Sequence, residues 1–429
     1  MKPQEWVGLF NVDRDDSPCF SGKIKFSLES GIVLEYRIAG TLVPPKSEVL
    51  YGILNSGEKC TLIGLHSFEH SGMNGNSAIV SRFGEIHFSY LIIGKFVQLE
   101  SLYKRCIYSF YNLQEFIFPD GYKSFVKISK EPIKSIQLRN GTIEIRNHAV
   151  LESLNQDLHG QIFSNNDIAL EKLCTAFKEI QSESDRSEFF WKKDLSYKFY
   201  RKSQHGLPIK DHIDELLKIG NLFSLLMNRP VYPDQIELVD DSDYKMNVFV
   251  GMYLDNKTFE LAKKEISYFR MPIVQKDIEL ADVICEWLDK ESSYSTVCSR
   301  IQHETGFKTE SQLFGEIVLA ATQFEMISFN DNIKSERFLY PIKKYGSSGV
   351  EQALVKLFRC VNQNDVGKGI AAVRNEIAHI GRPKVILNQF ILSNISELAY
   401  LMNLVVNGYA LKMIKVNDGA IQKFYENQI

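Results

Sequence analysis

The sequence lacks the features that mark secreted, membrane-spanning and zinc-binding proteins. Its 429 residues contain only seven cysteines, an odd number with no Cys-x-x-Cys pair, so neither a disulfide framework nor a zinc site is indicated. They are Cys19, Cys60, Cys106, Cys174, Cys285, Cys298 and Cys360. The first residues form no apolar signal core, and polar residues interrupt every apolar stretch before it reaches the length of a membrane span. We therefore expect a cytoplasmic protein that does not contact a membrane, and no metal or cofactor is indicated.

The sequence also lacks a large excess of charge. The formal net charge is -3 at pH 7, which excludes a globally basic nucleic-acid coat protein. Because the chain has no overall positive charge, any contact with a nucleic acid must be local. Apolar residues make up 44% of the chain, as in ordinary globular proteins.

The pattern of apolar residues divides the chain into two parts, as its length suggests. From Trp6 to about His148 apolar and polar residues alternate, with turn residues at 29–31 and 55–57, which predicts β-hairpins. From about Asp255 the periodicity becomes helical. The fold class predicted is α+β, with a β-rich, sandwich- or barrel-like domain over residues 1–250, helical toward its end, and an all-α bundle over residues 251–429.

A polar run in the helical part is the strongest candidate for a functional site. Residues 374–379 read Arg-Asn-Glu-Ile-Ala-His. At about 100° per residue, Asn375 and His379 share one face of a helix and Arg374 lies on its flank. The opposite, apolar stripe consists of Ile370, Val373, Ile377 and Ile380. Gly381, Arg382 and Pro383 should end the helix, which leaves His379 in its last turn.

The same arginine-to-histidine spacing occurs once more, at Arg82 and His87. That run is broken by a glycine, alternates as a β-strand does, and has Phe83 where the helical run has Asn375. We expect no functional role for Arg82 or His87.

The run at 374–379 resembles the signature of HEPN-domain ribonucleases, in which an arginine, a polar residue and a histidine lie on a helix of a bundle. The resemblance implies metal-independent cleavage of RNA, in which the ribose 2'-OH attacks the adjacent phosphate and leaves a cyclic phosphate and a 5'-OH. His379 would exchange a proton near neutral pH, and Arg374 would hold the phosphate. Asn375 would position the histidine or the scissile phosphate, so the catalytic candidates are Arg374, Asn375 and His379.

About the first 250 residues contain a second recognisable pattern. It consists of Trp6-x-Gly8-x-Phe10, Gly22-Lys23-Ile24, Leu50–Leu54, Cys60-Thr61-Leu62 and the segment 222–230. This pattern resembles that of the ApeA N-terminal domain family, although Phe116 stands where that family leads us to expect a tryptophan. The family accompanies C-terminal HEPN domains in bacterial anti-phage proteins. This implies abortive infection, in which a phage-derived trigger releases the nuclease onto RNA such as tRNA. The N-terminal domain would then sense the infection or restrain the nuclease.

Two other functions stay open. The helical part could be a non-catalytic HEPN module that binds a nucleotide or a partner as an adaptor, although such a module has no need of His379. It could also belong to a metal-dependent nuclease, which chelation would expose.

Two further features each have two interpretations. Tyr197–Lys202, with Trp191–Lys193 before it, interleaves aromatic and basic residues as a nucleic-acid surface does. We favour an edge strand with one buried and one solvated face. Glu325 could orient Arg374 across the bundle, or it could simply be an exposed glutamate, which is the safer interpretation.

The spacing of the motif predicts at least a homodimer. On a regular helix Arg374 and His379 lie about 140° apart around the axis and about 7.5 Å apart along it, so they do not easily converge on one phosphate. A second copy related by a two-fold axis would present its own pair to the same groove. Ala371, Ala372 and Ala378 are small enough to let two such helices approach closely.

Overall fold

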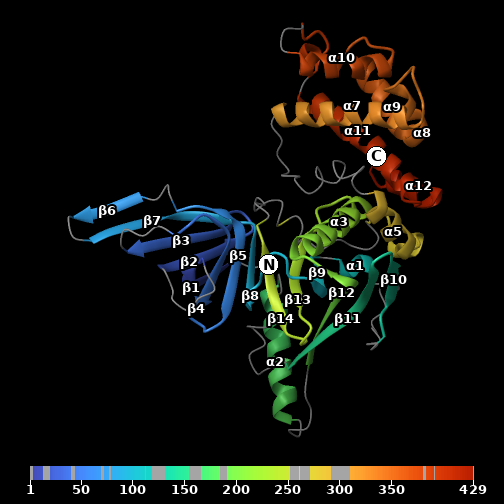
Figure 1. The fold of residues 1–429 in the computed structure, drawn as a ribbon. Coiled ribbons are helices and arrows are strands. Elements are labelled where there is room, and N and C mark those ends of the chain that lie inside the picture. Colours follow the sequence, from blue (N-terminus) through green and yellow to red (C-terminus); the bar gives the residue numbers. More distant parts are fainter. Residues whose placement is uncertain are drawn as a thin grey trace.

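The structure is a computed structural model and describes most of the chain. The described residues are 3–12, 20–39, 44–68, 72–76, 79–111, 113–117, 131–153, 166–183, 191–251, 260, 271–290, 310–379, 383–390 and 392–428. The described strands all lie before residue 251, with three of the described α-helices among them in sequence, and the helices from residue 310 on form a separate bundle (Figure 1). The expected α+β class is therefore confirmed.

The described strands form one 14-stranded sheet in which all neighbouring strands are antiparallel. Its order is β10-β11-β12-β9-β13-β14-β8-β5-β4-β1-β2-β3-β7-β6. One lobe contains β1 (Gln4–Asn11), β2 (Phe20–Ser27), β3 (Gly31–Ala39), β4 (Ser47–Leu54), β5 (Lys59–His66), β6 (Gly72–Asn76), β7 (Ile79–Phe88) and β8 (Tyr90–Gly94). The other contains β9 (Tyr103–Phe110), β10 (Lys134–Leu138), β11 (Gly141–Ser153), β12 (Trp191–Leu207), β13 (Pro233–Val239) and β14 (Lys245–Val250).

The first lobe curls so that distant strands of its order meet. The backbone N–H of Ser89, just after β7, donates to the carbonyl of Ile63 in β5 over 2.9 Å. The hairpins form where alternation predicted them, because one face of each strand is buried in the core. On β3, for example, the buried alternating residues are Ile32, Leu34, Tyr36 and Ile38.

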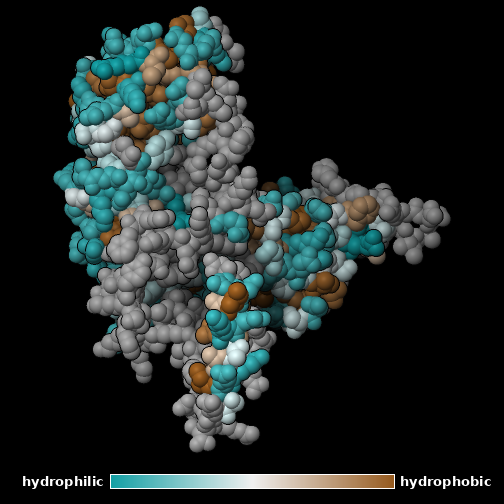
Figure 2. Space-filling model, turned by 180° about the vertical axis from the view of Figure 1, so that it is seen from behind, coloured by the Kyte–Doolittle hydropathy of each residue, from teal (hydrophilic) through white to brown (hydrophobic). Residues whose placement is uncertain are grey.

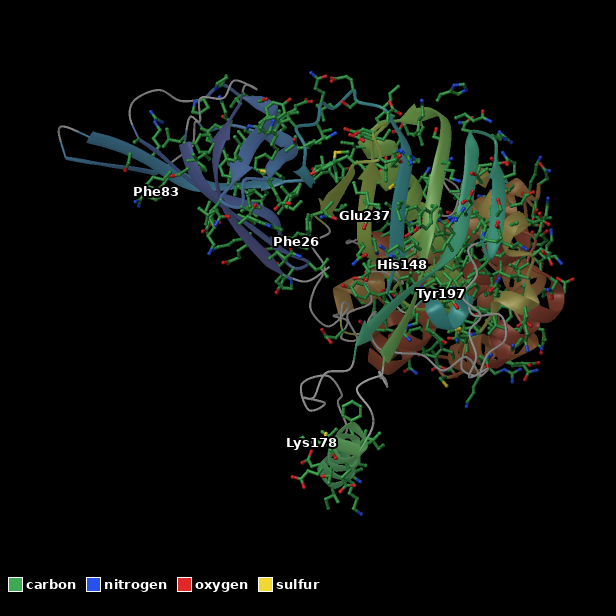
Figure 3. All side chains as sticks on the ribbon, turned by 90° about the horizontal axis from the view of Figure 1, so that it is seen from below. Phe26, Phe83, His148, Lys178, Tyr197 and Glu237 are labelled. Carbon is green, nitrogen blue, oxygen red and sulfur yellow. The ribbon has the colours of Figure 1, made fainter. Side chains whose placement is uncertain are left out.

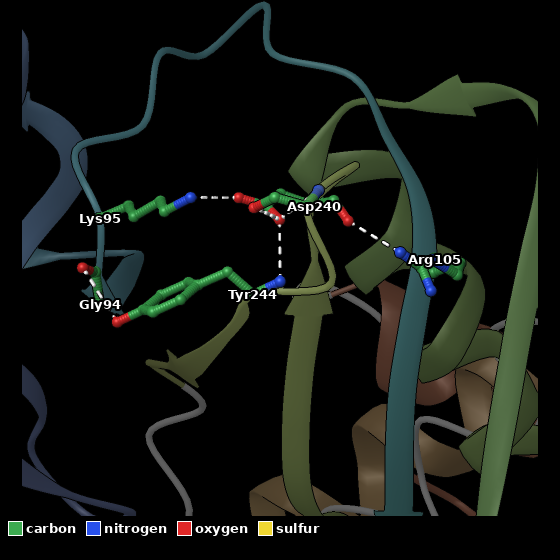
Figure 4. A network of polar contacts seen from close by, with 6 residues as sticks. Gly94, Lys95, Arg105, Asp240 and Tyr244 are labelled. Atoms are coloured by element: carbon green, nitrogen blue, oxygen red, sulfur yellow. Dashed lines mark hydrogen bonds and ion pairs between the residues drawn. The ribbon is translucent and has the colours of Figure 1, made fainter.

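A polar network joins the two lobes where β8, β9 and the β13–β14 turn meet (Figure 4). The Lys95 ammonium donates to the carboxylate of Asp240, which also accepts from the Tyr244 backbone N–H at 2.9 Å. The Arg105 guanidinium donates to the Asp240 carbonyl at 2.8 Å. These contacts hold the Asp240 pKa well below its ordinary value, chiefly through the hydrogen bond from Lys95.

Helices cover one face of the second lobe. They are α3 (Ile209–Met227) and α5 (Leu280–Lys290), with short α1 (Gln114–Ile117) and η2 (Gln275–Asp277) nearby. Glu215 on α3 binds the buried Arg201 guanidinium of β12 through two hydrogen bonds, at 2.6 and 3.1 Å. On α5, the fully buried Trp287 donates its Nε1–H to the Lys218 carbonyl of α3 at 2.7 Å. Helix α5 thus packs with the sheet part, although it lies beyond the domain boundary predicted at residue 250. That boundary stays a prediction.

Helix α2 (Asp167–Glu183) projects from the sheet and exposes apolar side chains, visible from behind in Figure 2. Ile168, Leu173 and Ile180 are exposed on it, whereas Cys174 and Phe177 are buried.

The C-terminal helices pack as a bundle around α11. They are α7 (Glu310–Asn330), α8 (Leu339–Tyr345), α9 (Ser348–Arg359), α10 (Val366–Ala378), η4 (Leu387–Gln389), α11 (Leu392–Met413) and α12 (Asp418–Glu426). Helix α11 contacts α7, α8, α9 and α12, and most of its side chains are buried, so it forms the core of the bundle. Among the described residues, no helix combines the length and hydrophobicity needed to cross a membrane.

The bundle meets the sheet part at its α12 end, whereas α10 lies at the far end (Figure 1). The Lys423 ammonium of α12 lies 2.9 Å from the Asp277 carboxylate of η2. Asn417 caps α12 and also donates to the Asp277 carbonyl, and Lys415 pairs with Glu286 of α5. These polar contacts hold the α12 end of the bundle to the sheet part.

Candidate functional site

Helix α10 holds the polar run because its other face is anchored in the bundle. Asp365 caps its N-terminus by accepting the Lys368 backbone N–H at 2.9 Å. Ile370 and Val373 are fully buried and Ile377 is half-buried, as the predicted apolar stripe requires. Ile380, the fourth member of that stripe, lies outside the described residues.

Arg374 is held beside α7 and is half-buried. Its Nη1 donates to Oδ1 of Asn375 at 3.2 Å, and its Nη2 lies 3.7 Å from Oε2 of Glu325 on α7. Its buried Nε has no hydrogen-bond partner among the described residues. Glu325 is half-buried and ion-paired, so the interpretation of it as a simple exposed glutamate is wrong. Because the Nε–H is shielded from solvent, an incoming acceptor would have to bind the Nη groups, of which only one N–H is used in a described hydrogen bond.

His379 is exposed at the end of α10 and no longer has helical geometry. The helix ends at Ala378, and His379 is its C-cap with an extended backbone, φ -117° and ψ 101°. Its N–H still donates to the Asn375 carbonyl at 3.1 Å. The expectation that His379 belongs to the last helical turn is therefore wrong by one residue, and the separation of 140° estimated for a regular helix does not apply to it.

The three predicted residues form one surface group connected through Asn375. Its side chain accepts from Arg374 and its backbone carbonyl accepts from His379. Among the described contacts, none joins the imidazole of His379 to the guanidinium of Arg374. The group therefore presents a half-buried guanidinium beside an exposed imidazole, without a described direct bond between them.

Sequence reasoning missed Glu376, which lies within the run and is 7% exposed. Its carboxylate accepts the backbone N–H groups of Ile386, at 3.1 Å to each oxygen, and of Leu387, at 3.0 Å. The signal was available, because position 376 is only about 60° from Val373 on a helical wheel. An acidic residue there must be buried with partners.

The second arginine-to-histidine run lies on a strand, as predicted. Arg82 and His87 are both on β7, and five residues of strand separate them by about 17 Å and place them on opposite faces. They cannot act on one phosphate.

The aromatic and basic run at 197–202 is only partly an edge. Phe199–Lys202 pair with β11 on one side and β9 on the other, so the edge-strand interpretation is wrong for these residues. Trp191–Lys198 pair with β11 alone in the described register. The physical reason is that β9 is inserted beside the long β12 only over its second half.

Two cations of this run are paired with carboxylates on other strands. Lys198 lies 3.5 Å from Glu237 of β13, two strands away in the sheet, and Lys202 lies 2.7 Å from Glu144 of the adjacent β11. Glu237 and the nearby His148 are labelled in Figure 3. Burial lowers the pKa of His148, and the Lys198 charge lowers it further. The run thus makes cross-strand ion pairs in this structure.

Within the described ranges, no three His, Cys, Asp or Glu side chains gather as metal ligands would.

Fold and site together define an α+β protein in which a large antiparallel sheet precedes a helical bundle with an Arg-Asn-x-x-x-His run at its far end. Over residues 5–287 the chain matches the family described as ApeA N-terminal domain 1, and it belongs to that family. This confirms the resemblance predicted for the N-terminal part and indicates an anti-phage defence protein. Phe116, the departure from the expected tryptophan, is fully buried against Phe223, with ring centroids 5.3 Å apart. No curated protein and no solved structure matches the chain.

Proposed function

We propose that this protein is an anti-phage abortive-infection endoribonuclease of the HEPN type that acts in the cytoplasm without a metal. The observation that supports the proposal best is the surface group on α10. There, the half-buried Arg374 guanidinium uses only one Nη N–H in a described hydrogen bond and lies beside Asn375, next to the exposed His379. The substrate is RNA, with tRNA as the first candidate.

In the proposed reaction, the ribose 2'-OH loses its proton as its oxygen bonds to the adjacent phosphorus, and the bond from phosphorus to the 5'-oxygen breaks. The 5'-oxygen takes up a proton, so the products are a 2',3'-cyclic phosphate and a 5'-OH. His379 exchanges a proton with these oxygens, because imidazole titrates near neutral pH. Arg374 binds the negative phosphate oxygens, and Asn375 holds the guanidinium in position.

The first experiment compares single substitutions in cleavage and toxicity assays. Arg374→Ala should lower cleavage by about 10²- to 10³-fold, as the loss of a charge-stabilising donor does, and His379→Ala by about 10²- to 10⁴-fold. Both proteins should melt like the wild type, because the side chains lie off the buried stripe. Arg82→Ala and His87→Ala are the matched controls and should cleave normally. Undiminished cleavage by folded Arg374→Ala protein would contradict the assignment.

The second experiment examines products and metal dependence. Cleaved RNA should end in a cyclic phosphate, and EDTA should leave the rate unchanged. Activity that vanishes with EDTA and returns with magnesium would favour a metal-dependent nuclease. RNA or nucleotide binding without cleavage would favour the non-catalytic adaptor.

We also propose that the active unit is a homodimer in which two α10 helices face one another. Ala378 and His379 are exposed, and Ala371 and Ala372 are half-buried, so small side chains surround the motif. A two-fold interface would place one copy of the motif against the other. Specific activity should fall on dilution together with the dimer seen by light scattering. A monomer with constant specific activity down to nanomolar concentration would exclude a composite site.

A further inference from the structure

The segment after the motif returns to α10 and is held there by Glu376. Ile386 and Leu387, at the start of η4, donate three backbone hydrogen bonds to the Glu376 carboxylate. This carboxylate is one of the few charged groups buried among the described residues. A buried carboxylate is costly unless such donors satisfy it, so the contact is specific to this side chain.

His379 lies between the two points at which the chain is fixed. On one side its own N–H bonds to the Asn375 carbonyl, and on the other Ile386 bonds to Glu376, three residues before His379. Lys384 adds a contact to α7, where its ammonium lies 5.7 Å from the centre of the Phe314 ring. The chain from His379 to Ile386 therefore starts and ends on the last turns of α10.

We propose that Glu376 is a positioning residue for the nuclease, and that by binding Ile386 and Leu387 it holds the last turn of α10, from which His379 projects, in place. The inference rests on the proposed function for its catalytic consequence. His379 keeps its N–H bond to the Asn375 carbonyl, but its ψ is extended, so this bond fixes its backbone nitrogen and not the direction of its imidazole. The contact with Glu376 limits how far the last turn, and with it the C-cap, can move. Misplacement of a catalytic group by about 1 Å can lower a rate by about 10²-fold, so a clamp of this kind affects turnover more than binding.

The test compares Glu376→Ala with Glu376→Gln. Alanine removes all acceptors, whereas glutamine keeps one carbonyl oxygen of similar position and can still accept from the backbone. We expect the Ile386 and Leu387 amides to exchange hydrogen much faster in Glu376→Ala and to be partly protected in Glu376→Gln. We expect kcat for RNA to fall about 10- to 100-fold in the alanine variant with KM nearly unchanged, and to recover partly in the glutamine variant.

A matched control separates positioning from simple loss of stability. Val350 is fully buried on α9 in the same bundle. Val350→Ala should therefore lower the melting temperature without changing kcat at temperatures where the protein stays folded. If Glu376→Ala leaves the two amides as protected as in the wild type, the clamp is refuted. If the amides loosen but kcat stays at the wild-type value, the positioning role is refuted.

The role of Glu376 can be tested even if the proposed nuclease function is wrong. Should the wild-type protein not cleave RNA, the amide exchange still decides the clamp. The chemical shifts and titration of the 13C-labelled His379 ring then decide its orientation. A His379 signal that is identical in wild type and Glu376→Ala would overturn the inference, and a changed signal would support it.

Discussion

Glu325→Gln tests how much the ion pair between α7 and α10 contributes to the motif. The substitution removes the carboxylate charge while it keeps the shape of the side chain. The Arg374 Nη2 to Glu325 Oε2 distance is 3.7 Å, and the two side chains are 31% and 33% exposed. That distance is too long for a hydrogen bond, so the pair is held by charge attraction through partly solvated surroundings.

The expected magnitude is small and its direction is defined. Pairs of this exposure contribute about 0.2–1 kcal/mol, which corresponds to about 1.4- to 5-fold in an equilibrium constant. Glu325 also repels a phosphate that approaches Arg374. We therefore expect Glu325→Gln to raise kcat/KM by at most about fivefold, mainly through a lower KM, with kcat nearly unchanged.

The assay is the initial rate on a fluorogenic RNA over a range of salt concentrations. The effect should diminish as salt rises, because exposed charges are screened. Glu316→Gln, on the same helix about 13 Å away, is the control for a general change of charge. A fall in kcat of tenfold or more in Glu325→Gln would refute this reasoning, because it would make the carboxylate a participant or a required orienting group.

Two predictions concern the sheet part. Trp287→Ala should lower the free energy of unfolding by about 3–5 kcal/mol in urea titrations, because it empties a fully buried site between α5 and α3. An unchanged midpoint would show that α5 does not belong to the cooperative unit of the sheet. The second prediction follows from the lowered pKa of Asp240. A carboxyl whose pKa is lower in the folded than in the unfolded state stabilises the fold above its unfolded pKa of about 4. This contribution is lost as the pH falls toward the folded pKa. Asp240→Asn should therefore destabilise at pH 7 and flatten the fall in melting temperature between pH 5 and pH 2, and an acid profile identical to that of the wild type would contradict the assignment.

Local sequence signals predicted the elements of this fold well where one face of an element is buried. The turns predicted at 29–31 and 55–57 were local signals too, since Gly31 and Gly57 have φ values of +71° and +84°, a region that favours glycine. These hairpin turns are therefore encoded by residues within the turns themselves. The same holds for the apolar stripe of α10, where Ile370 and Val373 are fully buried.

The order of strands could not be read in the same way. Strand β14 pairs with β8 and β9 lies between β12 and β13, so residues 91 to 160 positions apart become neighbours. These pairings depend on how the lobes pack and not on any local periodicity. For this reason the sequence predicted a β-rich domain but not one continuous sheet, and it misassigned the second half of β12 as an edge.

The candidate site shows the same division between local and distant contacts. Arg374, Asn375 and His379 were found because they are adjacent in sequence and share a pattern. Helix α7 brings Glu325 to Arg374, and Glu376, which lies within the motif, binds the segment at Ile386, and no spacing rule connects α7 or that segment to the motif. The sequence alone favoured an exposed Glu325 and indicated no partner for Glu376.

The position of α7 connects the junction with the motif. The bundle meets the sheet part through α12, whereas α10 is at the opposite end, so a change at the junction must cross the bundle to affect Arg374. Helix α7 packs against α11, which contacts α12, and it also packs against α10. It contributes Glu325 at the end of that route. A restraint imposed by the N-terminal part would therefore have to reach the motif through α11 and then through α7 or α9, both of which pack against α10, and of these two helices it is α7 that carries Glu325 beside the guanidinium.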